Sequence, residues 1–364
     1  MGFNCGIVGL PNVGKSTLFN ALTSTQAAEA ANYPFCTIEP NTGRVGVPDP
    51  RLDRLAAIAG SAKIIPTQFE FVDIAGLVRG ASKGEGLGNQ FLANIRETDA
   101  VLHVLRCFEG DVTHVEGSVD PVRDAETVET ELMLADMDGL ERRVQSAAKR
   151  AKGGDKDAKT EIELMERALA VLREGKPART VALSPDEREP FRRLALLTSK
   201  PVLYVCNVSE DEAATGNAHS ARVEAMAKAQ GAEAVVISAA IEAELAQLSP
   251  EEKQEFLASI GLEEPGLNKV IRAGYRLLGL LTFFTVGPKE ARAWTVNVGA
   301  TAPEAAGVIH TDFQRGFIKA ETIDYDSYVA LGGEQGAKDA GKMRQEGKEY
   351  VVRDGDIFHF RFNV

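Results

Sequence analysis

The sequence predicts an α/β fold in which a phosphate-binding sheet carries an inserted antiparallel helical hairpin and is followed by a C-terminal β-grasp domain. Three observations support this prediction. An apolar segment leads directly into a glycine-rich loop near the N-terminus, the composition shifts to Ala, Lys, Arg, Glu and Leu from about 141 to 200, and the tail reads as strands around one helix. We therefore expect a nucleotide-binding domain at 1–140 and 201–279, a helical coiled-coil insertion at 141–200 and a β-grasp domain at 280–364.

The first element is a short strand at 3–8, which leads into the pattern G-x-x-x-x-G-K-[ST] at 9–16. A helix is expected directly afterwards, so backbone N–H groups and the helix dipole face an anion. Lys15 can reach the β- and γ-phosphates of a nucleotide, and the Ser16 hydroxyl can ligate Mg²⁺. The predicted nucleotide contacts of this loop are Gly9, Asn12, Val13, Gly14, Lys15, Ser16 and Thr17. The pattern indicates a P-loop NTPase sheet, and a chance match in a glycine-rich turn is the alternative.

Composition and charge restrict the class of protein. The 364 residues suffice for two or three domains, and no apolar run approaches the roughly 18 residues that span a bilayer. The N-terminus runs straight into the first strand, so we expect no signal peptide. The four cysteines form no C-x-x-C pair, which favours buried thiols in a reducing compartment. We expect a cytoplasmic monomer with no membrane partner, and the net charge of −12 argues against extensive coating of nucleic acid.

Two further segments have the pattern of nucleotide-dependent switch loops. A strand at 68–73 ends in D-x-x-G, where Asp73 can hold Mg²⁺ through water and the N–H of Gly76 can bond the γ-phosphate. The proline-punctuated loop at 32–41 carries Thr37, which can complete the Mg²⁺ shell while the triphosphate is bound. The predicted metal ligands are therefore Ser16, Thr37 and Asp73. We interpret the glycine-rich run that follows, at 80–89, as a mobile switch rather than an ordinary surface loop.

Helical periodicity marks the segment from Glu141 to about Lys200. Gly153-Gly154 divides it into two helices, and one apolar seam is formed by Met165, Leu169, Val171 and Leu172. The basic run at 142–152 fits a solvated helix face, and an RNA or ribosome contact is the alternative.

The chain returns to the nucleotide-binding domain at Pro201 and leaves it near Leu280. Strands are then expected at 282–286, 292–296, 317–320 and 356–360, with a helix opened at Thr301. Strands around one helix favour a β-grasp module. Its segment from Lys338 to Lys348 has a mild positive bias, which fits a weak RNA-facing edge about as well as an ordinary charged surface.

The segment that would read the base departs from the guanine-binding pattern. GTPases of this class use N-K-x-D at the end of a strand, and here the strand at 201–206 ends in Asn207-Val208-Ser209-Glu210. The longer Glu side chain argues against guanine specificity, because the carboxylate must meet the base edge at hydrogen-bond distance. Asn207 offers a carboxamide to the N6/N7 edge of adenine, and Val208 offers an apolar contact. A second base-contacting loop is predicted at Ser238 and Ala239, where the usual lysine is absent. From these residues alone the nucleotide is not clearly GTP.

Together these motifs resemble a known family. The segments N-Y-P-F-C-T-I-E-P-N at 32–41, D-I-A-G-L-V-R-G-A-S-K-G-E-G-L-G at 73–88 and V-R-D-G-D at 352–356 are similar to those of the YchF/Obg-like ATPases, and the likeness covers essentially the whole chain. The resemblance implies an Obg-related P-loop NTPase with a C-terminal TGS domain. It also implies a preference for ATP over GTP.

The catalytic residues are less evident. Many relatives place a Gln after D-x-x-G to orient water, but Leu77 stands there and cannot polarise water. Asn12 occupies the form G-x-P-N-x-G-K-S, which in related NTPases helps to hold K⁺ against the phosphates. His114 follows the strand at 101–105 on the ligand side of the sheet, and a surface histidine without a catalytic role is the alternative. His103 alternates with apolar residues and is predicted to lie in the core.

The leading hypothesis is an ATP-hydrolysing switch whose hairpin and β-grasp module dock the ribosome, its RNA or another translation-related partner, with Mg²⁺ as cofactor and K⁺ as a second ion. The first alternative is a conventional GTPase switch. The second is a nucleotide-gated binding scaffold with incidental hydrolysis, which Leu77 makes reasonable.

Overall fold

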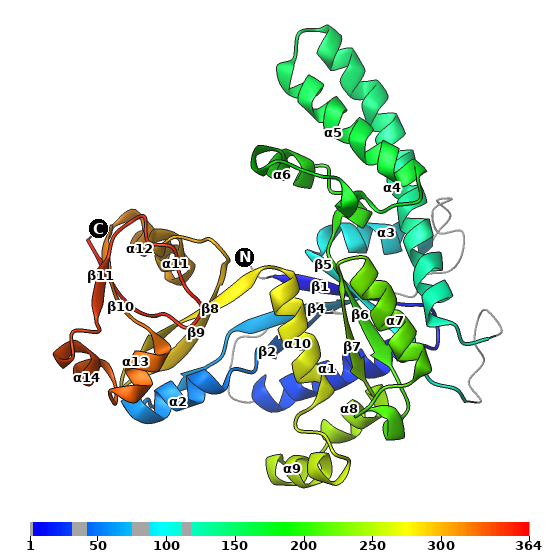
Figure 1. Cartoon of the computed structure of the whole chain (residues 1–364). Helices are drawn as coiled ribbons and strands as arrows, with labels where there is room; N and C mark the ends of the chain where they lie inside the picture. The colour runs from blue at the N-terminus through cyan, green and yellow to red at the C-terminus, as the bar shows by residue number, and fades with distance from the viewer. Residues whose placement is uncertain (1–2, 31–41, 75–86, 111–117, 364) are drawn as a thin grey trace. The chain divides into compact units, whose positions relative to one another are not determined.

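The computed structural model describes residues 3–30, 42–74, 87–110 and 118–363, and Figure 1 shows their course along the chain. The chain divides into two compact units. Apart from the first two residues, the first unit takes in 3–44 and 70–270, and the second takes in 45–69 and 271–364. The helical hairpin is thus part of the first unit, and the second unit is assembled from two stretches that lie far apart in the sequence.

The first unit is built on a six-stranded sheet with the order β2-β4-β1-β5-β6-β7. Its strands are β1 (Asn4–Val8), β2 (Thr42–Gly46), β4 (Gln68–Asp73), β5 (Ala100–Arg106), β6 (Val202–Asn207) and β7 (Glu233–Ile237). β1 pairs in parallel with β4 and β5, and β6 pairs in parallel with β5 and β7. All of β5 is buried, as expected for a parallel strand covered on both faces. The carboxyl ends of these five strands therefore lie along one edge of the sheet.

Helices follow these strands, and two of them begin at a capping box. The helices are α1 (Lys15–Ala30), α3 (Leu87–Glu97), α7 (Ala218–Ala229), α8 (Ala239–Leu245), α9 (Pro250–Ser259) and α10 (Gly266–Leu277). α9, for example, begins after a capping box of Ser249 and Glu252, with Pro250 at its first position. Within the described ranges, no helix combines the length and the apolar character needed to cross a bilayer.

The hairpin consists of α4 (Pro121–Lys152) and α5 (Lys156–Arg173), and α4 begins well before residue 141, where the composition changes. The cause is local, because Asp120 accepts a hydrogen bond from the N–H of Arg123 and Pro121 occupies the first helical position. The turn between the helices falls at Gly153-Gly154, as predicted, and Gly154 has a φ of +91°.

One apolar cluster holds the two helices together. It includes Leu140, Ala147, Leu164, Met165, Ala168, Leu169 and Leu172. The prediction for Val171 is wrong, since this residue is only half-buried and lies outside the cluster. Each helical residue turns by about 100°, so position 171 points away from the face that 165, 169 and 172 share.

The return of the hairpin to the sheet is fixed by a buried carboxylate. A short helix α6 (Pro185–Arg192) and the 3-10 turn Leu197–Ser199 follow α5. Asp136 of α4 is 3 % exposed and accepts hydrogen bonds from the N–H groups of Leu197 and Thr198 at 2.9 and 2.8 Å, and from the Thr198 hydroxyl at 2.7 Å. Burial raises the pKa of this carboxyl, although the three donors favour its charged form.

The second unit contains a separate sheet with the order β11-β10-β12-β8-β9-β3. Its strands are β3 (Ile64–Ile65), β8 (Leu280–Val286), β9 (Ala291–Asn297), β10 (Phe317–Ile323), β11 (Arg344–Glu346) and β12 (Ile357–Phe362). Its helices are α2 (Pro50–Ala59), α11 (Ala302–Ile309), α12 (Thr311–Arg315), α13 (Tyr325–Ala330) and α14 (Glu334–Asp339). The four strands predicted in the tail are β8, β9, β10 and β12, and the predicted helix is α11, capped by Thr301.

Both faces of this second sheet are covered. Phe283, Phe358 and Phe360 pack with the alanines of α11 on one face. Phe284, Ile323 and Ile357 pack with Leu52 and Leu55 of α2 on the other. Because neighbouring residues of a strand face opposite sides, Phe283 and Phe284 belong to different cores.

Candidate functional site

The residues predicted to bind nucleotide meet at the carboxyl edge of the first sheet. The phosphate loop follows β1, Asp73 ends β4, Asn207 ends β6, and Ser238 follows β7. β1 and β4 are in parallel register with Ile7 opposite Asp73, so the loop after β1 and the end of β4 are neighbours. Ligands of open parallel sheets bind at this edge.

The phosphate loop packs tightly against neighbouring backbone. A Cβ atom on Gly14, whose φ is +91°, would overlap the Nδ2 atom of Asn207, and a Cβ on Gly9 would lie 2.7 Å from the carbonyl oxygen of Val104. Asn12 also has a positive φ of +63°. The spacing of glycines in the motif is therefore required by this conformation.

Lys15 and Asp73 form an ion pair at the start of α1 and the end of β4, with side chains 10 % and 21 % exposed. Ser16 and Thr17 are exposed beside this pair in the first turn of α1. A hydroxyl and a carboxylate are the hard oxygen donors that Mg²⁺ prefers. In the ranges that the structure describes, no group of three or more His, Cys, Asp or Glu side chains could hold a metal by itself. The donors present thus fit an Mg²⁺ that is bound mainly through phosphate and water.

Asn207 connects two loops of the site. Its Nδ2 donates to the carbonyl oxygen of Val13 at 2.9 Å, and its Oδ1 accepts from the N–H of Ala239 at 2.9 Å. The side chain is 4 % exposed. The predicted contact of this carboxamide with the base stays a prediction, and in the structure the carboxamide holds the phosphate loop against the loop after β7.

The predicted contact of Val208 with the base stays a prediction, and the structure describes this side chain in the core. Val208 is 2 % exposed and packs with Tyr204, Cys206 and Val223 in the core beside β6. Its N–H donates to the carbonyl oxygen of Ile237 at 2.9 Å, so the residue joins β6 to β7. Glu210, by contrast, is exposed at the position where the guanine-binding pattern has Asp.

The loop after β7 encloses a small polar cavity. Ser238 and Glu242 are each 2 % exposed, and both line a cavity of about 10 Å³, which is room for one water. Among the described residues, neither Ser238 Oγ nor Glu242 Oε2 has a hydrogen-bond partner. Glu242 Oε1 accepts from the N–H of Gly266 at 2.7 Å, at the N-terminus of α10. Burial raises the pKa of Glu242 to about 7 against the effect of these backbone donors and Lys269.

Arg106 is a site residue that sequence reasoning missed. It is 1 % exposed at the carboxyl end of β5, opposite Asn207 of β6. Its guanidinium donates to the carbonyl oxygens of Phe108 and Gly110 at 3.1 and 3.4 Å and lies over the Phe108 ring. Arg106 therefore fixes the start of the loop that leads toward His114. The available signal was an arginine that ends an otherwise apolar strand.

The prediction of a core histidine at position 103 is confirmed. His103 is 4 % exposed, and its ring lies 5.8 Å from that of Tyr204. Burial lowers the pKa of His103 to about 4, with a further contribution from the charge of Arg179. Cys5, Cys107 and Cys206 are free, buried thiols, also as expected.

Four residues named from the sequence lie outside the described part of the chain. They are Thr37, Gly76, Leu77 and His114. Their predicted contacts to Mg²⁺, the γ-phosphate and water stay predictions.

Comparison with known proteins gives matches along the whole chain. Residues 4–128 match a family described as 50S ribosome-binding GTPase, and residues 280–363 match the family YchF-GTPase_C, described as a protein of unknown function. The chain is 62 % identical over 365 residues to the ribosome-binding ATPase YchF of Haemophilus ducreyi, with 100 % of both chains covered. It is 55 % identical over 367 residues to the ribosome-binding ATPase YchF of Bacillus subtilis, again with 100 % of both covered.

A solved structure gives the same result for the fold. The structure of the Schizosaccharomyces pombe YchF GTPase superposes with a TM-score of 0.89 at 37 % identity, covering 99 % of this chain and 98 % of that one.

Proposed function

The chain belongs to the YchF family of P-loop NTPases, and we propose that it is an ATP-hydrolysing switch that binds the ribosome. The observation that carries the proposal is the pairing of Lys15 with Asp73 at the end of the glycine-rich loop. In this pairing, the ammonium group proposed to bind the β- and γ-phosphates lies next to the carboxylate proposed to bind Mg²⁺. A Cβ atom on Gly9 or Gly14 of the loop would overlap neighbouring atoms.

ATP rather than GTP is the proposed nucleotide. Asn207 is held by two protein backbone groups, and the exposed Glu210 replaces the shorter Asp that would pair with guanine. The names of the relatives differ on this point, since the curated relatives are named ATPases and the solved structure a GTPase. The remaining donor hydrogen of the Asn207 amide is the group that we assign to the base, together with the backbone of Ser238 and Ala239.

The remaining site residues have proposed roles that follow the sequence. Ser16, Thr37 and Asp73 hold Mg²⁺, which neutralises charge on the β- and γ-phosphates, and the N–H of Gly76 bonds the γ-phosphate. Asn12 holds K⁺ beside the phosphates, and His114 orients the attacking water. The phosphate contacts come from the loop between Gly9 and Thr17.

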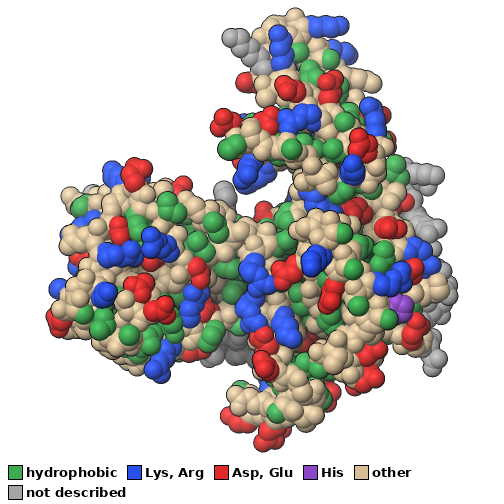
Figure 2. Space-filling view, viewed as in Figure 1, with side chains coloured by type: hydrophobic (Ala, Val, Ile, Leu, Met, Phe, Trp, Pro, Cys, Tyr) green, Lys and Arg blue, Asp and Glu red, His purple; other side chains and the backbone are tan. Residues whose placement is uncertain are grey.

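The ribosome is the proposed partner because the matched relatives carry that name and because the hairpin offers a basic end. The last turn of α4 carries Lys149, Arg150 and Lys152, and Figure 2 shows Lys and Arg side chains at the tip of the hairpin. Basic clusters of this kind attract phosphate backbones. The ribosome as partner also supports a cytoplasmic location, and we keep the monomeric state as a proposal from the sequence.

Calorimetric titration of the full chain with ATP and with GTP, each with Mg²⁺, tests the nucleotide. ATP should bind at least about tenfold more tightly, and a matched titration of Lys15→Ala should show loss of binding without loss of fold. Equal or tighter binding of GTP would return the protein to the conventional GTPase switches.

Co-sedimentation with ribosomes tests the partner. The ATP-bound chain should pellet with ribosomes, and Lys15→Ala should stay in the supernatant under the same salt. Ribosome binding that is identical with and without nucleotide would favour a scaffold with incidental hydrolysis.

A further inference from the structure

A cavity of about 650 Å³ opens in the second unit and is lined from both faces of its sheet. Phe358 and Phe360 belong to the face that packs α11, whereas Ile323 and Ile357 belong to the face that packs α2. The cavity therefore reaches both faces of the sheet, and its lining includes residues of two neighbouring strands.

The two strands are β8 and β12. They run in parallel, and within these described strands their pairing consists of one register pair, Phe284 with Ile357. The N–H of Phe284 donates to the carbonyl oxygen of Asp356 at 2.8 Å, just before this pair. Beyond it, Val286 of β8 and Phe360 of β12 both line the cavity. β8 ends at Val286, two residues after this pair, so the described strands leave two inner edges here, a short one at the end of β8 and a longer one on β12 beyond Ile357.

The backbone groups on these edges can be assigned by alternation along each strand. The N–H of Phe284 faces β12, so the N–H and carbonyl of Val286, two residues later, face the gap. The next residue supports this assignment. The N–H of Gly287 donates to the carbonyl oxygen of Glu290 in the β8–β9 hairpin, so it faces β9, away from the gap. On β12 the carbonyl of Asp356 faces β8. By the same alternation, the backbone N–H and carbonyl groups of Phe358 and Phe360 also face the β8 side.

We propose that an extended peptide inserts between β8 and β12 as an additional strand. Backbone groups of Val286 and Phe360 would bond its main chain, and its side chains would alternate between the Phe358/Phe360 face and the Ile323/Ile357 face. Main-chain bonding combined with alternating side-chain pockets is the physics of strand addition to a sheet edge. The cavity volume lies within the range of sites that bury a ligand.

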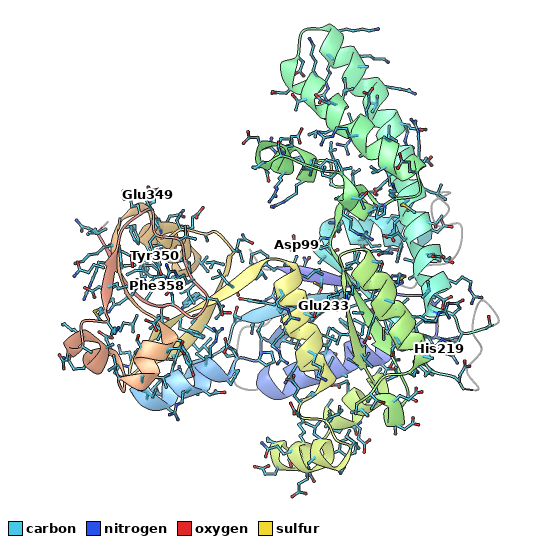
Figure 3. All side chains as sticks on the ribbon, in the orientation of Figure 1. Asp99, His219, Glu233, Glu349, Tyr350 and Phe358 are labelled. Atoms are coloured by element: carbon cyan, nitrogen blue, oxygen red, sulfur yellow. The ribbon has the colours of Figure 1, made fainter. Side chains whose placement is uncertain are left out.

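The walls of the gap are held in place by packing. The Phe358 ring lies edge-on to Phe283 and Tyr350, at 5.5 and 6.3 Å between ring centroids, and Figure 3 shows Tyr350 and Phe358 close together in this unit. The Nε1–H of Trp294 donates a hydrogen bond to the Thr285 hydroxyl oxygen at 2.9 Å. A wall that is already ordered costs little conformational entropy on binding.

The lining also defines the chemistry of the peptide. Because both faces are apolar, the inserted residues are a continuous apolar run. The cavity is lined by three carboxylates, Glu290, Glu321 and Glu334, against Lys289 and His359. Glu321 already accepts from Arg361 at 3.0 Å, so the attraction falls to Glu290 and Glu334. The expected ligand is thus a short apolar segment flanked by Lys or Arg, which goes beyond the nucleotide switch and is independent of it.

The probe is a fluorescein-labelled peptide Lys-Lys-Val-Ile-Val-Ile-Lys-Lys, titrated against the full chain by fluorescence anisotropy. We expect micromolar binding, and at least about tenfold weaker binding of the control Lys-Lys-Val-Ser-Val-Ser-Lys-Lys, which presents an apolar side to one face only. Hydrogen exchange should show new protection at the amides of Val286 and Phe360.

The test variant is Val286→Pro, which removes the N–H that faces the gap without removing a bond to β9. Its matched control is Val286→Thr, which keeps the N–H and the branched shape. The proline variant should weaken the probe at least about tenfold and the threonine variant by less than about threefold, with both melting cooperatively. Glu334→Lys, outside the strands, should weaken the probe as well.

Three results would overturn the proposal. One is no binding of the probe at about 1 mM. Another is equal affinity of the folded proline and threonine variants. The third is a self-associated chain whose partner copy the probe cannot displace, which would assign the gap to a second copy of this chain.

Discussion

Glu242, beside the loop after β7, is predicted to make stability depend on pH. Because burial raises its pKa from 4.5 to about 7, the folded protein retains a proton that the unfolded chain has released. The free energy of unfolding should therefore fall as the pH rises from about 4.5 to about 7, and stay at the lower value above that. Glu242→Gln should lose this dependence and exceed the free energy of unfolding of the parent at about pH 8 by roughly 3 kcal/mol.

Urea unfolding at several pH values measures this effect. Glu244→Gln, an exposed position on the same helix, is the matched control and should follow the parent. A Glu242→Gln variant with the pH profile of the parent would show that the carboxyl is charged in the folded protein.

The catalytic prediction concerns His114 and K⁺. Since Leu77 cannot orient water, we expect slow intrinsic hydrolysis that His114→Ala slows by at least about tenfold in kcat with little change in ATP affinity. Replacing K⁺ by Na⁺ should slow the same step, because the ion adds a fixed positive charge where the transition state gathers negative charge.

Single-turnover hydrolysis separates this step from product release. His219→Ala is the control. His219 lies on α7 (Figure 3), its Nε2 is 3.4 Å from Oε1 of Glu109, and it has no proposed role in catalysis. Parent-like rates for His114→Ala would remove the histidine from the mechanism, and equal rates in K⁺ and Na⁺ would reduce Asn12 to a structural loop residue.

At single positions, the sequence predicted where the candidate site residues lie in the fold better than it predicted the side-chain contacts that they make. Lys15 and Asp73 could be predicted because a strand, a glycine turn and a helix leave the backbone little choice. The contacts of Asn207 and Val208 could not, since they depend on which side chains the loop after β7 brings within reach. That choice is made by packing between β6 and β7, and a motif does not encode it.

Among the elements, the hairpin is held to the segment after it by the buried carboxylate of Asp136, and removing this carboxylate should measurably lower the free energy of unfolding. Asp136→Ala would leave the N–H groups of Leu197 and Thr198 buried without their acceptor. The expected loss is roughly 2–4 kcal/mol of unfolding free energy, with earlier proteolysis in the segment after α5. Asp138→Ala, at an exposed position two residues further along α4, should change stability by less than about 0.5 kcal/mol. Equal urea midpoints for the two variants would contradict this role of Asp136.

Helices and strands with a clear hydrophobic periodicity were predicted near their observed positions. Elements whose ends depend on a local cap, or whose pairing partner is distant in the sequence, were not. α4 begins at a cap, Asp120-Pro121, that precedes the change in composition. α2 begins at the similar signal Asp49-Pro50. The two-residue strand β3 exists because Ile64 pairs with Ala291, more than two hundred residues away, and such a pairing leaves no local pattern.

For the whole molecule, the division into units makes the C-terminal segment incomplete by itself. Leu52 and Leu55 of α2 are 3 % and 0 % exposed against Phe284 and Ala293. A fragment of residues 280–364 should therefore be poorly folded, because each missing Leu contact costs roughly 2–5 kcal/mol. The same fragment joined to 45–69 by a flexible linker should fold.

Thermal melting followed by the fluorescence of Trp294 compares the two fragments. A joined fragment carrying Leu55→Asp is the control and should behave like 280–364 alone. A cooperative transition in the short fragment at the temperature of the joined one would show that α2 is dispensable.

The assembly of the second unit from two distant stretches also has a consequence in time. Chain growth proceeds at about 5–20 residues per second, so α2 emerges on the order of 10–40 s before the strands that cover it. Throughout that interval the Leu52 and Leu55 side of the helix is exposed to solvent, where other apolar segments can bind it. Slower elongation would lengthen this exposure, so the yield of native protein should depend on codon choice downstream of residue 69.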